Sequence, residues 1–198
     1  GLLLQASGEL SVAERFWTHL AEQLVPEDLA LLGQAAIDTN QPHLAVMISK
    51  RAARRGLTIA APYYPLHSLV EMDLPMAPEM TLAIARRESE FDPVVQSGVG
   101  ARGLMQIMPA TWASLRRAHS FGDDPFDPRE NILAGTAYLR AMYDRFGSPG
   151  FLAAYNAGPA RYQDFLATGR SLPTETRNYL SILAPIIGAQ QHGPLADE

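Results

Sequence analysis

The chain has 198 residues, 47% of them hydrophobic, and a formal net charge of -5 at pH 7. This length and composition allow the buried core of one domain and part of a second. The negative net charge argues against nucleic acid as the main partner, because phosphate binding requires a basic face. The absence of cysteine excludes a disulfide framework and a thiolate metal site. No apolar run approaches the roughly 18 residues of a membrane span.

Three amphipathic helices are predicted in the first part of the chain. A capping-box pattern of Ser11 and Glu14 opens the first, which we expect to end near Gln23. Pro26 and Pro42 suit the first positions of the other two. The apolar residues that we expect to face inward are Val12, Phe16, Leu20 and Leu24, then Leu29, Leu32, Ala36 and Ile37, and then Leu44, Met47, Ile48 and Ala52. Short helices with tight turns are typical of the end of a helical-repeat solenoid, although no sequence period is evident.

A proline-rich connector, APYYPL, follows these helices. Its two prolines exclude a continuous helix, so we place a domain border near residues 60–75. Residues 1–70 are then helical hairpins, and residues 71–198 form a second domain. The two tyrosines of the connector could stack on a sugar, but aromatic residues in such a segment more often fix it to the core. The histidines of the preceding helices are expected to have surface or packing roles.

The next helix places a carboxylate on an apolar face. About three turns are predicted from Met80 to Phe91, between two prolines that limit the helix. Spacings of four, four and three put Glu88 on one face with Met80, Ile84 and Phe91. Glu88 is therefore either an edge residue paired with an arginine or a carboxyl group in apolar surroundings. In the second case desolvation raises its pKa, and it could act as the acid in glycoside cleavage.

A loop of small residues follows this helix, with Ser97, Gly98, Gly100 and Gly103. Such a loop lets backbone approach a ligand closely. The apolar run after it contains one amide, Gln106. A polar group among apolar neighbours is either satisfied by its own fold or directed at a ligand.

Two longer helices are predicted next. Pro109 begins the first, and Asp127 is expected to be the N-cap of the second, which ends at Gly147. The three aspartates between residues 119 and 128 lack the spacing, the central Gly and the closing Glu of a calcium-binding loop. We therefore predict no metal site.

The carboxyl-terminal part is predicted as three helices that begin near Pro149, Pro159 and Thr174. The first stops at Asn156-Ala157-Gly158, where Asn and Gly suit a left-handed cap. The hydroxyl of Tyr155 needs a partner if its ring packs inward. Glu175, in the first turn of the last helix, is favoured by the helix dipole whether or not it has a further role.

Three short motifs occur in a fixed order: Glu88-Ser89, Gly103-Leu104-Met105-Gln106, and Ala154-Tyr155-Asn156-Ala157-Gly158. With the loop between the first two, they resemble the soluble lytic transglycosylases, whose catalytic domain is similar to goose-type lysozyme. The resemblance covers roughly residues 75–187. It implies an all-α fold, lysozyme-like with at most a very small β element, for residues 71–198. Residues 1–70 then resemble the last turns of the superhelical region that often precedes this domain.

The resemblance implies cleavage of peptidoglycan between N-acetylmuramic acid (MurNAc) and N-acetylglucosamine (GlcNAc), with formation of a 1,6-anhydro ring and without a cofactor or metal. It identifies Glu88 as the catalytic residue. The substrate-binding residues that it implies are Ser97, Leu104, Met105, Gln106, Tyr155, Asn156, Glu175 and Tyr179. Arg87 stands where relatives often have Gln, which changes the charge beside the acid.

Glycosidases commonly pair two carboxylates, and no convincing second one adjoins Glu88. Glu90 lies about 200° around the helix from Glu88, and Asp92 is placed to cap or turn the chain. In the resembled family the acetamido oxygen of the substrate supports the positive charge at the anomeric carbon. Glu88 alone then donates a proton to the leaving oxygen and takes one from the muramoyl C6 hydroxyl.

Two alternatives remain open at the level of sequence. One is a goose-lysozyme-like muramidase, which is a hydrolase, and the other is a non-catalytic domain that binds peptidoglycan or acts as a scaffold. The N-terminal helices could dock a cell-envelope protein. Such a substrate places the protein in the bacterial periplasm or cell envelope. The start, GLLLQASGEL, lacks the charged region of a signal peptide, so we expect a processed form or a piece of a longer protein.

Overall fold

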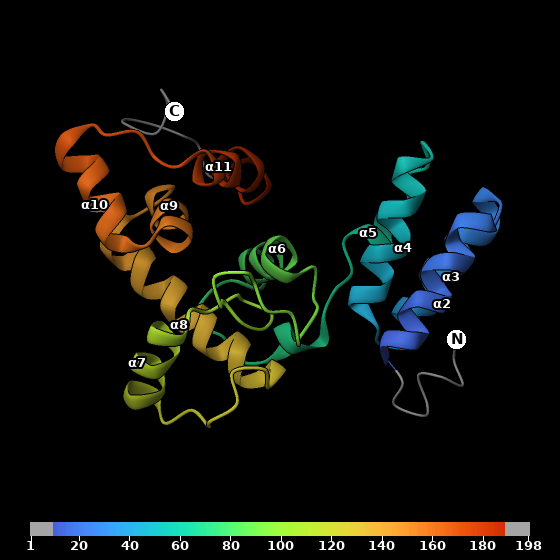
Figure 1. Ribbon diagram of the computed structural model, residues 1–198, viewed down its shortest axis with the longest axis horizontal. Helices are drawn as coiled ribbons and strands as arrows, with labels where there is room; N and C mark the ends of the chain where they lie inside the picture. Colours follow the sequence, from blue (N-terminus) through green and yellow to red (C-terminus); the bar gives the residue numbers. More distant parts are fainter. Residues whose placement is uncertain (1–9, 189–198) are drawn as a thin grey trace. The chain divides into compact units, whose positions relative to one another are not determined.

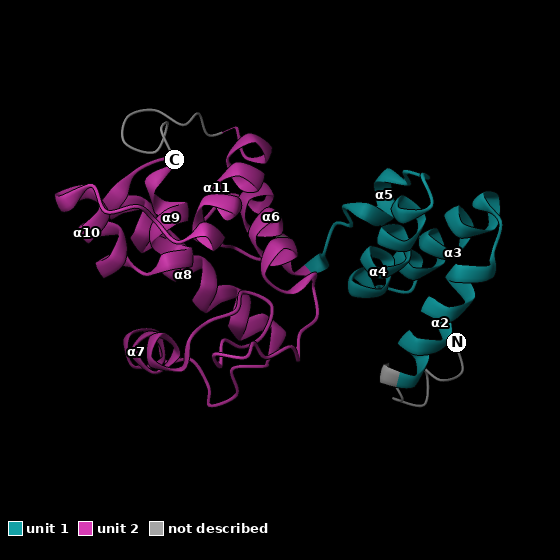
Figure 2. Ribbon diagram, turned by 45° about the horizontal axis from the view of Figure 1, so that its top comes forward, with its two compact units in different colours: residues 1–68 teal, residues 69–198 magenta. Residues whose placement is uncertain are grey.

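The computed structural model describes residues 10–188, and within them it contains ten α-helices, one 3-10 helix and no β-strand (Figure 1). The predicted all-α fold class is therefore confirmed. Isolated β-bridges join Arg102 to Gln96 and to Ile107. Contacts between Cα atoms divide the chain into two compact units, Gly1–Ser68 and Leu69–Glu198 (Figure 2). In the described part, no helix combines the length and the apolar character needed to cross a membrane.

The first unit contains α2 (Leu10–Gln23), α3 (Pro26–Asp38), α4 (Pro42–Arg54) and the short α5 (Ala60–Tyr63). Helix α4 packs against the other three. The prolines at 26 and 42 occupy the first helical turns, as predicted. The predicted inward faces of α3 and α4 are largely confirmed. The core of this unit includes Leu29, Leu32, Ala36, Leu44, Ile48 and Ala52, and Ile37 packs against it, whereas Met47 is only half-buried.

The predicted inward face of α2 is wrong for Val12 and Phe16, although the other two residues predicted to face inward, Leu20 and Leu24, do pack against the core. Val12 and Phe16 are 45% and 50% exposed, whereas Ala13, Trp17 and Ala21 are buried. The indole of Trp17 supplies the apolar area, and the two alanines, one turn away on either side, leave room for it. Periodicity identified an apolar face correctly but chose the wrong one of two overlapping faces.

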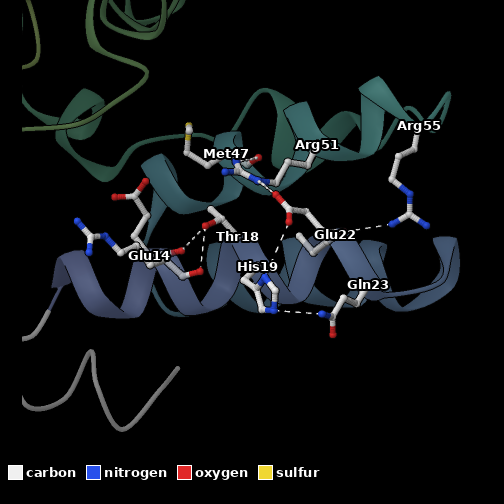
Figure 3. Close-up of polar contacts among 10 residues, drawn as sticks. Glu14, Thr18, His19, Glu22, Gln23, Met47, Arg51 and Arg55 are labelled. Atoms are coloured by element: carbon white, nitrogen blue, oxygen red, sulfur yellow. Dashed lines mark hydrogen bonds and ion pairs between the residues drawn. The ribbon is translucent and has the colours of Figure 1, made fainter.

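The carboxyl end of α2 is held by Arg55, which follows α4 (Figure 3). Its guanidinium donates to the carbonyl oxygens of Ala21 at 3.1 Å and Leu24 at 2.7 Å. The last carbonyls of a helix lack partners within it, and a cation there also complements the helix dipole. His19 contacts the side chain of Gln23 at 3.1 Å on the exposed face, in the surface role predicted for it.

The capping box predicted for α2 is wrong. Leu10 and Ser11 already belong to the helix, so Ser11 is not its N-cap. The side chain of Ser11 lies outside the described residues. Further along α2, the Thr18 hydroxyl donates to the carbonyl of Glu14 at 2.8 Å, a contact within the helix that is common for threonine (Figure 3).

The second unit is built around α9 (Gly150–Ala157), most of which is buried. Helix α9 packs against α8 (Pro128–Phe146), α10 (Pro159–Thr168) and α11 (Thr174–Ile186). A helix that is apolar on all sides belongs in a core, which explains its central place. The remaining helices, α6 (Pro78–Ser89) and α7 (Pro109–His119), both contact α8, and α6 also contacts α11. The 3-10 helix η1 (Ser68–Glu71) begins at the last residue of the first unit.

Helix α6 ends at Ser89, two residues before the predicted end. The Ser89 hydroxyl donates to the carbonyl of Ala85 at 2.9 Å and accepts from the N–H of Phe91 at 3.1 Å. Glu90 and Phe91 have φ of 53° and 63°, in the left-handed region that non-glycine residues rarely adopt. The chain therefore turns sharply just after Glu88, although the ring of Phe91 remains buried.

The start of α8 follows the prediction. Asp127 is the N-cap, and its carboxylate accepts from the N–H of Glu130 at 2.8 Å. The carboxylate of Glu130 accepts from the N–H of Gly122 at 2.9 Å, which ties the preceding loop to the helix. Helix α8 ends at Phe146 and Gly147 follows, as predicted.

Candidate active site

Glu88 and Tyr179 form a hydrogen-bonded pair between α6 and α11. The Tyr179 hydroxyl donates to Oε1 of Glu88 at 2.7 Å. Tyr179 is only 2% exposed, so the pair is formed inside the packed interface of the two helices. The two residues are 91 positions apart in the chain, and the fold alone brings them together.

The electrostatic surroundings of Glu88 favour its neutral form. The pKa of Glu88 is raised from 4.5 to about 7, chiefly by burial and also by the negative charge of Glu175. The hydrogen bond from Tyr179 and the positive charge of Arg87 lower this pKa, but desolvation has the largest effect. Of the two sequence interpretations, the carboxyl in apolar surroundings fits better than the arginine-paired edge residue.

The charge of Glu88 also acts on Tyr155. Burial raises the pKa of the Tyr155 phenol well above 10.0, and the charge of Glu88 raises it further. The same two causes raise the pKa of Tyr179. Tyr155 donates to the carbonyl of Met105 at 2.7 Å, which is the partner that its inward packing was predicted to require. Both phenols therefore stay protonated while Glu88 titrates, and both serve as hydrogen-bond donors.

The loop that carries the second motif is held by its own polar groups. The side-chain amide of Gln106 donates to the carbonyls of Val95 at 3.2 Å and Gly103 at 3.0 Å, and Gln106 has φ of 47°. Ser97 Oγ accepts from the N–H of Ala101 at 2.9 Å. The N–H groups of the Gln106 amide thus bond to its own fold, which is the first of the two alternatives predicted for it.

The other residues predicted to bind substrate lie in the core, between two helices or on the surface. Leu104 and Met105 are 0% exposed, so their side chains lie in the core. Asn156 accepts from the hydroxyl of Thr176 at 2.7 Å and joins α9 to α11. The left-handed cap predicted at Asn156 is wrong, because α9 continues through Ala157 and only the following glycine has a positive φ. Glu175 is exposed in the first turn of α11.

Sequence reasoning missed Asn131, a fully buried residue of α8. Its Oδ1 accepts from the N–H of Met105 at 2.8 Å, and its Nδ2 donates to the carbonyls of Pro125 at 2.8 Å and Arg102 at 3.1 Å. The available signal was an amide at helical spacing from Gly135 and Leu139 on the buried face of α8. The same kind of signal had singled out Glu88.

Comparison with known proteins identifies the family to which this helical unit, with its part-buried carboxyl group, belongs. Residues 73–178 match the family described as Transglycosylase SLT domain, and the chain belongs to that family. The predicted resemblance is thereby confirmed.

Relatives match different portions of the chain. It is 42% identical over 117 residues to a soluble lytic murein transglycosylase of Salmonella typhimurium, a match covering 50% of this chain and 18% of the relative. The structure resembles the 70-kDa soluble lytic transglycosylase in complex with bulgecin A, with a TM-score of 0.79 and 29% identity over 92% of this chain and 33% of that one. A lytic transglycosylase of Pseudomonas aeruginosa, solved as an inactive glutamate-to-glutamine mutant, gives a TM-score of 0.75 and 26% identity over 93% and 33%. The chain thus spans a third or less of the length of these proteins.

Replacing Tyr179 by phenylalanine should raise the pKa of Glu88 above about 7. The hydrogen bond that the substitution removes favours the ionised carboxylate, so its loss favours the protonated form. Titration of the Glu88 carboxyl by ¹³C NMR measures the shift directly. Tyr138→Phe is the control, because the Tyr138 ring contacts Tyr155 and is not among the groups that shift Glu88. A lower midpoint in Tyr179→Phe than in the wild type would contradict this account.

Proposed function

We propose that residues 71–198 form a lytic transglycosylase domain that cleaves the β-1,4 bond between MurNAc and GlcNAc in peptidoglycan and releases 1,6-anhydro-MurNAc products. The observation that carries the proposal is the Glu88 carboxyl, whose pKa is raised to about 7 and which Tyr179 holds at 2.7 Å. A general acid works best when its pKa lies near the working pH. The name of the Salmonella relative, a soluble lytic murein transglycosylase, supports this substrate.

In the proposed reaction Glu88 acts twice. The protonated carboxyl first gives its proton to the glycosidic oxygen as the bond from that oxygen to the anomeric carbon of MurNAc breaks. The acetamido oxygen of the substrate supports the positive charge at that carbon. The Glu88 carboxylate then takes the proton of the C6 hydroxyl as O6 bonds to the anomeric carbon. The acid is regenerated, and no water is consumed.

The contacts of neighbouring carboxylates favour a mechanism with one carboxyl group. Asp92 accepts from the N–H of Val94 at 3.0 Å, in the turning role predicted for it. Glu175 is exposed and acts on Glu88 by raising its pKa, which supports an acid rather than a nucleophile. In the Pseudomonas relative, a single glutamate-to-glutamine change is described as inactivating.

The framework around Glu88 is proposed to orient the sugars. We assign the polar contacts to Ser97, Gln106, Tyr155, Asn156, Glu175 and Tyr179. Because Leu104 and Met105 are fully buried, we assign them to the apolar support of the loop, with their backbone nearest the substrate. Arg87 lies with its guanidinium 5.9 Å from the centre of the Tyr179 ring, where it adds positive charge beside the acid.

The two parts of the chain are proposed to have different tasks. Residues 1–70 would be the end of a superhelical region, whose helices could dock a cell-envelope protein. We place the protein in the bacterial periplasm or cell envelope, because that is where peptidoglycan is found. Two of the solved lytic transglycosylases match more than nine-tenths of this chain, residues before 71 included, which supports a place for the N-terminal helices in such a protein.

Digestion of purified sacculi, followed by mass spectrometry, tests the proposed function. The expected products end in 1,6-anhydro-MurNAc and are lighter by one water than the products of a hydrolase. Products with a free reducing MurNAc end would instead identify a muramidase. Binding to sacculi without any release of fragments would identify a non-catalytic domain.

A further inference from the structure

We propose that Asn131 is a positioning residue of this active site, which fixes the loop of residues 102–106 to α8. The inference rests on the proposed function, since it concerns how the groups around Glu88 are held. Asn131 is 0% exposed, so its polar atoms cannot be satisfied by bulk water. Each of its hydrogen bonds must therefore be made within the fold.

The amide of Asn131 joins two segments of backbone, the loop of residues 102–106 and the chain at Pro125. It accepts from Met105 at 2.8 Å and donates to Pro125 at 2.8 Å and Arg102 at 3.1 Å. An amide that both accepts and donates can do this, whereas an apolar residue of similar size would remove the partner of the buried Met105 N–H and of the Pro125 carbonyl. The Arg102 carbonyl would keep its bond from the N–H of Ile107. Asn131 thus fixes both the start of the loop and the backbone of Met105.

Met105 is held from a second direction by Tyr155. Asn131 of α8 binds its N–H, and the Tyr155 hydroxyl of α9 binds its carbonyl at 2.7 Å. Tyr155 lies close enough to Glu88 for the charge of the carboxylate to raise the pKa of its phenol. The position of Met105 therefore determines where the Tyr155 hydroxyl lies beside the acid.

Two glycines show how closely the loop is pressed against α8. A Cβ on Gly103 would lie 2.5 Å from Nδ2 of Asn131, and Gly103 has φ of 72°. A Cβ on Gly135, one turn along α8 from Asn131, would overlap the side chain of Met105. The loop has little freedom to shift while the Asn131 bonds are present, so their loss should release it.

Loss of the Asn131 bonds should affect Gln106 and Tyr155, and not the chemistry of Glu88 itself. Gln106 follows Met105 in a left-handed conformation and bonds to Gly103 within the same loop. Glu88 is held separately, by Tyr179 between α6 and α11. Removal of Asn131 should therefore loosen the groups that orient the substrate while leaving the proton donor in place.

A double-mutant cycle with Asn131→Ala and Tyr155→Phe tests the inference on defined glycan strands, at temperatures where circular dichroism shows every variant folded. Asn131→Ala should lower kcat/KM by roughly tenfold or more, mainly through KM, since small misplacements of orienting groups cost up to about a hundredfold. The double variant should lose little more than the worse single variant, because both act through Met105.

The matched control is Thr136→Ala on the same helix. Thr136 is also 0% exposed, but its hydroxyl donates to the carbonyls of Ile132 and Leu133 within α8. It should lower stability and leave KM within about twofold of the wild type, as expected for a substitution away from the site. Equal rises in KM for Asn131→Ala and Thr136→Ala, or fully additive losses in the cycle, would overturn the inference.

A second variant and a second measurement test the role of Asn131 if Asn131→Ala does not fold or if the wild type shows no activity. If Asn131→Ala does not fold, Asn131→Asp keeps the volume and the acceptor for Met105. An ionised carboxylate facing the carbonyls of Arg102 and Pro125 should still raise KM, and less so at lower pH, where it is protonated. Hydrogen exchange at the Met105 amide should be faster in Asn131→Ala, which removes the acceptor, than in Thr136→Ala. Unchanged exchange would reject the inference, whereas a wild type that releases no fragments would reject only the proposed function.

Discussion

Replacing Glu88 by glutamine is expected to abolish release of anhydro-muropeptides, with a loss of at least about 10³-fold, near the upper part of the range for a general acid. A glutamine amide cannot give up a proton to a leaving oxygen. It does keep the size of the side chain and an oxygen that can accept a hydrogen bond from Tyr179. In the wild type the Tyr179 hydroxyl donates to Glu88 at 2.7 Å. The pair between α6 and α11 should therefore persist, and mass analysis of digested sacculi measures the loss.

The stability of this variant separates loss of chemistry from loss of folding. The pKa of Glu88 is raised from 4.5 to about 7 in the folded state. Between these two values the unfolded chain ionises first, so the free energy of unfolding of the wild type falls as pH rises, by about 3 kcal/mol in all, and levels off above the folded pKa. Glutamine does not ionise, so Glu88→Gln should be at least as stable as the wild type at pH 8.

Glu90→Gln is the matched control for this experiment. Glu90 lies just beyond the end of α6 with φ of 53°, on the part of the turn that leads away from the helix. We expect its replacement to leave product release within about threefold of the wild type, because Glu90 is not among the groups that shift the pKa of Glu88. Activity of Glu88→Gln within tenfold of the wild type would reject Glu88 as the acid.

Replacing Gly135 by alanine is expected to destabilise the second unit by about 3 kcal/mol, the upper end of the cost of overpacking a core. In an exposed helix the same change stabilises by roughly 1 kcal/mol, so the sign itself is informative. The added Cβ would meet Cβ and Cγ of Met105, which is 0% exposed and cannot move into solvent. Urea denaturation measures the change in the free energy of unfolding.

Gly98→Ala provides the comparison for Gly135→Ala. A Cβ at Gly98 would meet no atom within 4 Å, and its backbone does not have the positive φ that favours glycine. We expect a change of about 0.5 kcal/mol or less, as for most surface substitutions. A Gly135→Ala protein as stable as the wild type would show that the loop can move away from α8, which would also weaken the role inferred for Asn131.

Local rules predicted the helix boundaries best. Pro26, Pro42, Pro109 and Pro128 all stand in the first turns of helices, and Asp127 makes the predicted cap. These features depend on backbone groups within a few residues, so sequence alone determines them. The face of α2 could not be predicted in the same way. Val12 and Phe16 share one face and Ala13 and Trp17 the next, and only packing against other helices selects between them.

In the candidate site, too, some features follow from nearby residues and others only from the packing of helices. The position of Glu88 on an apolar face follows from spacing, and so does the expectation of a raised pKa. The Tyr179 bond to Glu88, by contrast, requires α6 to pack against α11. Asn131 was missed because a buried amide becomes meaningful only when the loop that it binds, 26 residues away at Met105, is placed beside α8.

The pair between α6 and α11 also bears on the timing of activity during synthesis. Tyr179 belongs to the last helix of the described chain, and the burial of Glu88 where α6 packs against that helix raises the pKa of the carboxyl, although the Tyr179 hydrogen bond itself lowers it. A nascent or truncated polypeptide without α11 would leave Glu88 hydrated and ionised near neutral pH. Acid strength suited to the proposed cleavage would therefore appear only once α11 has folded against α6.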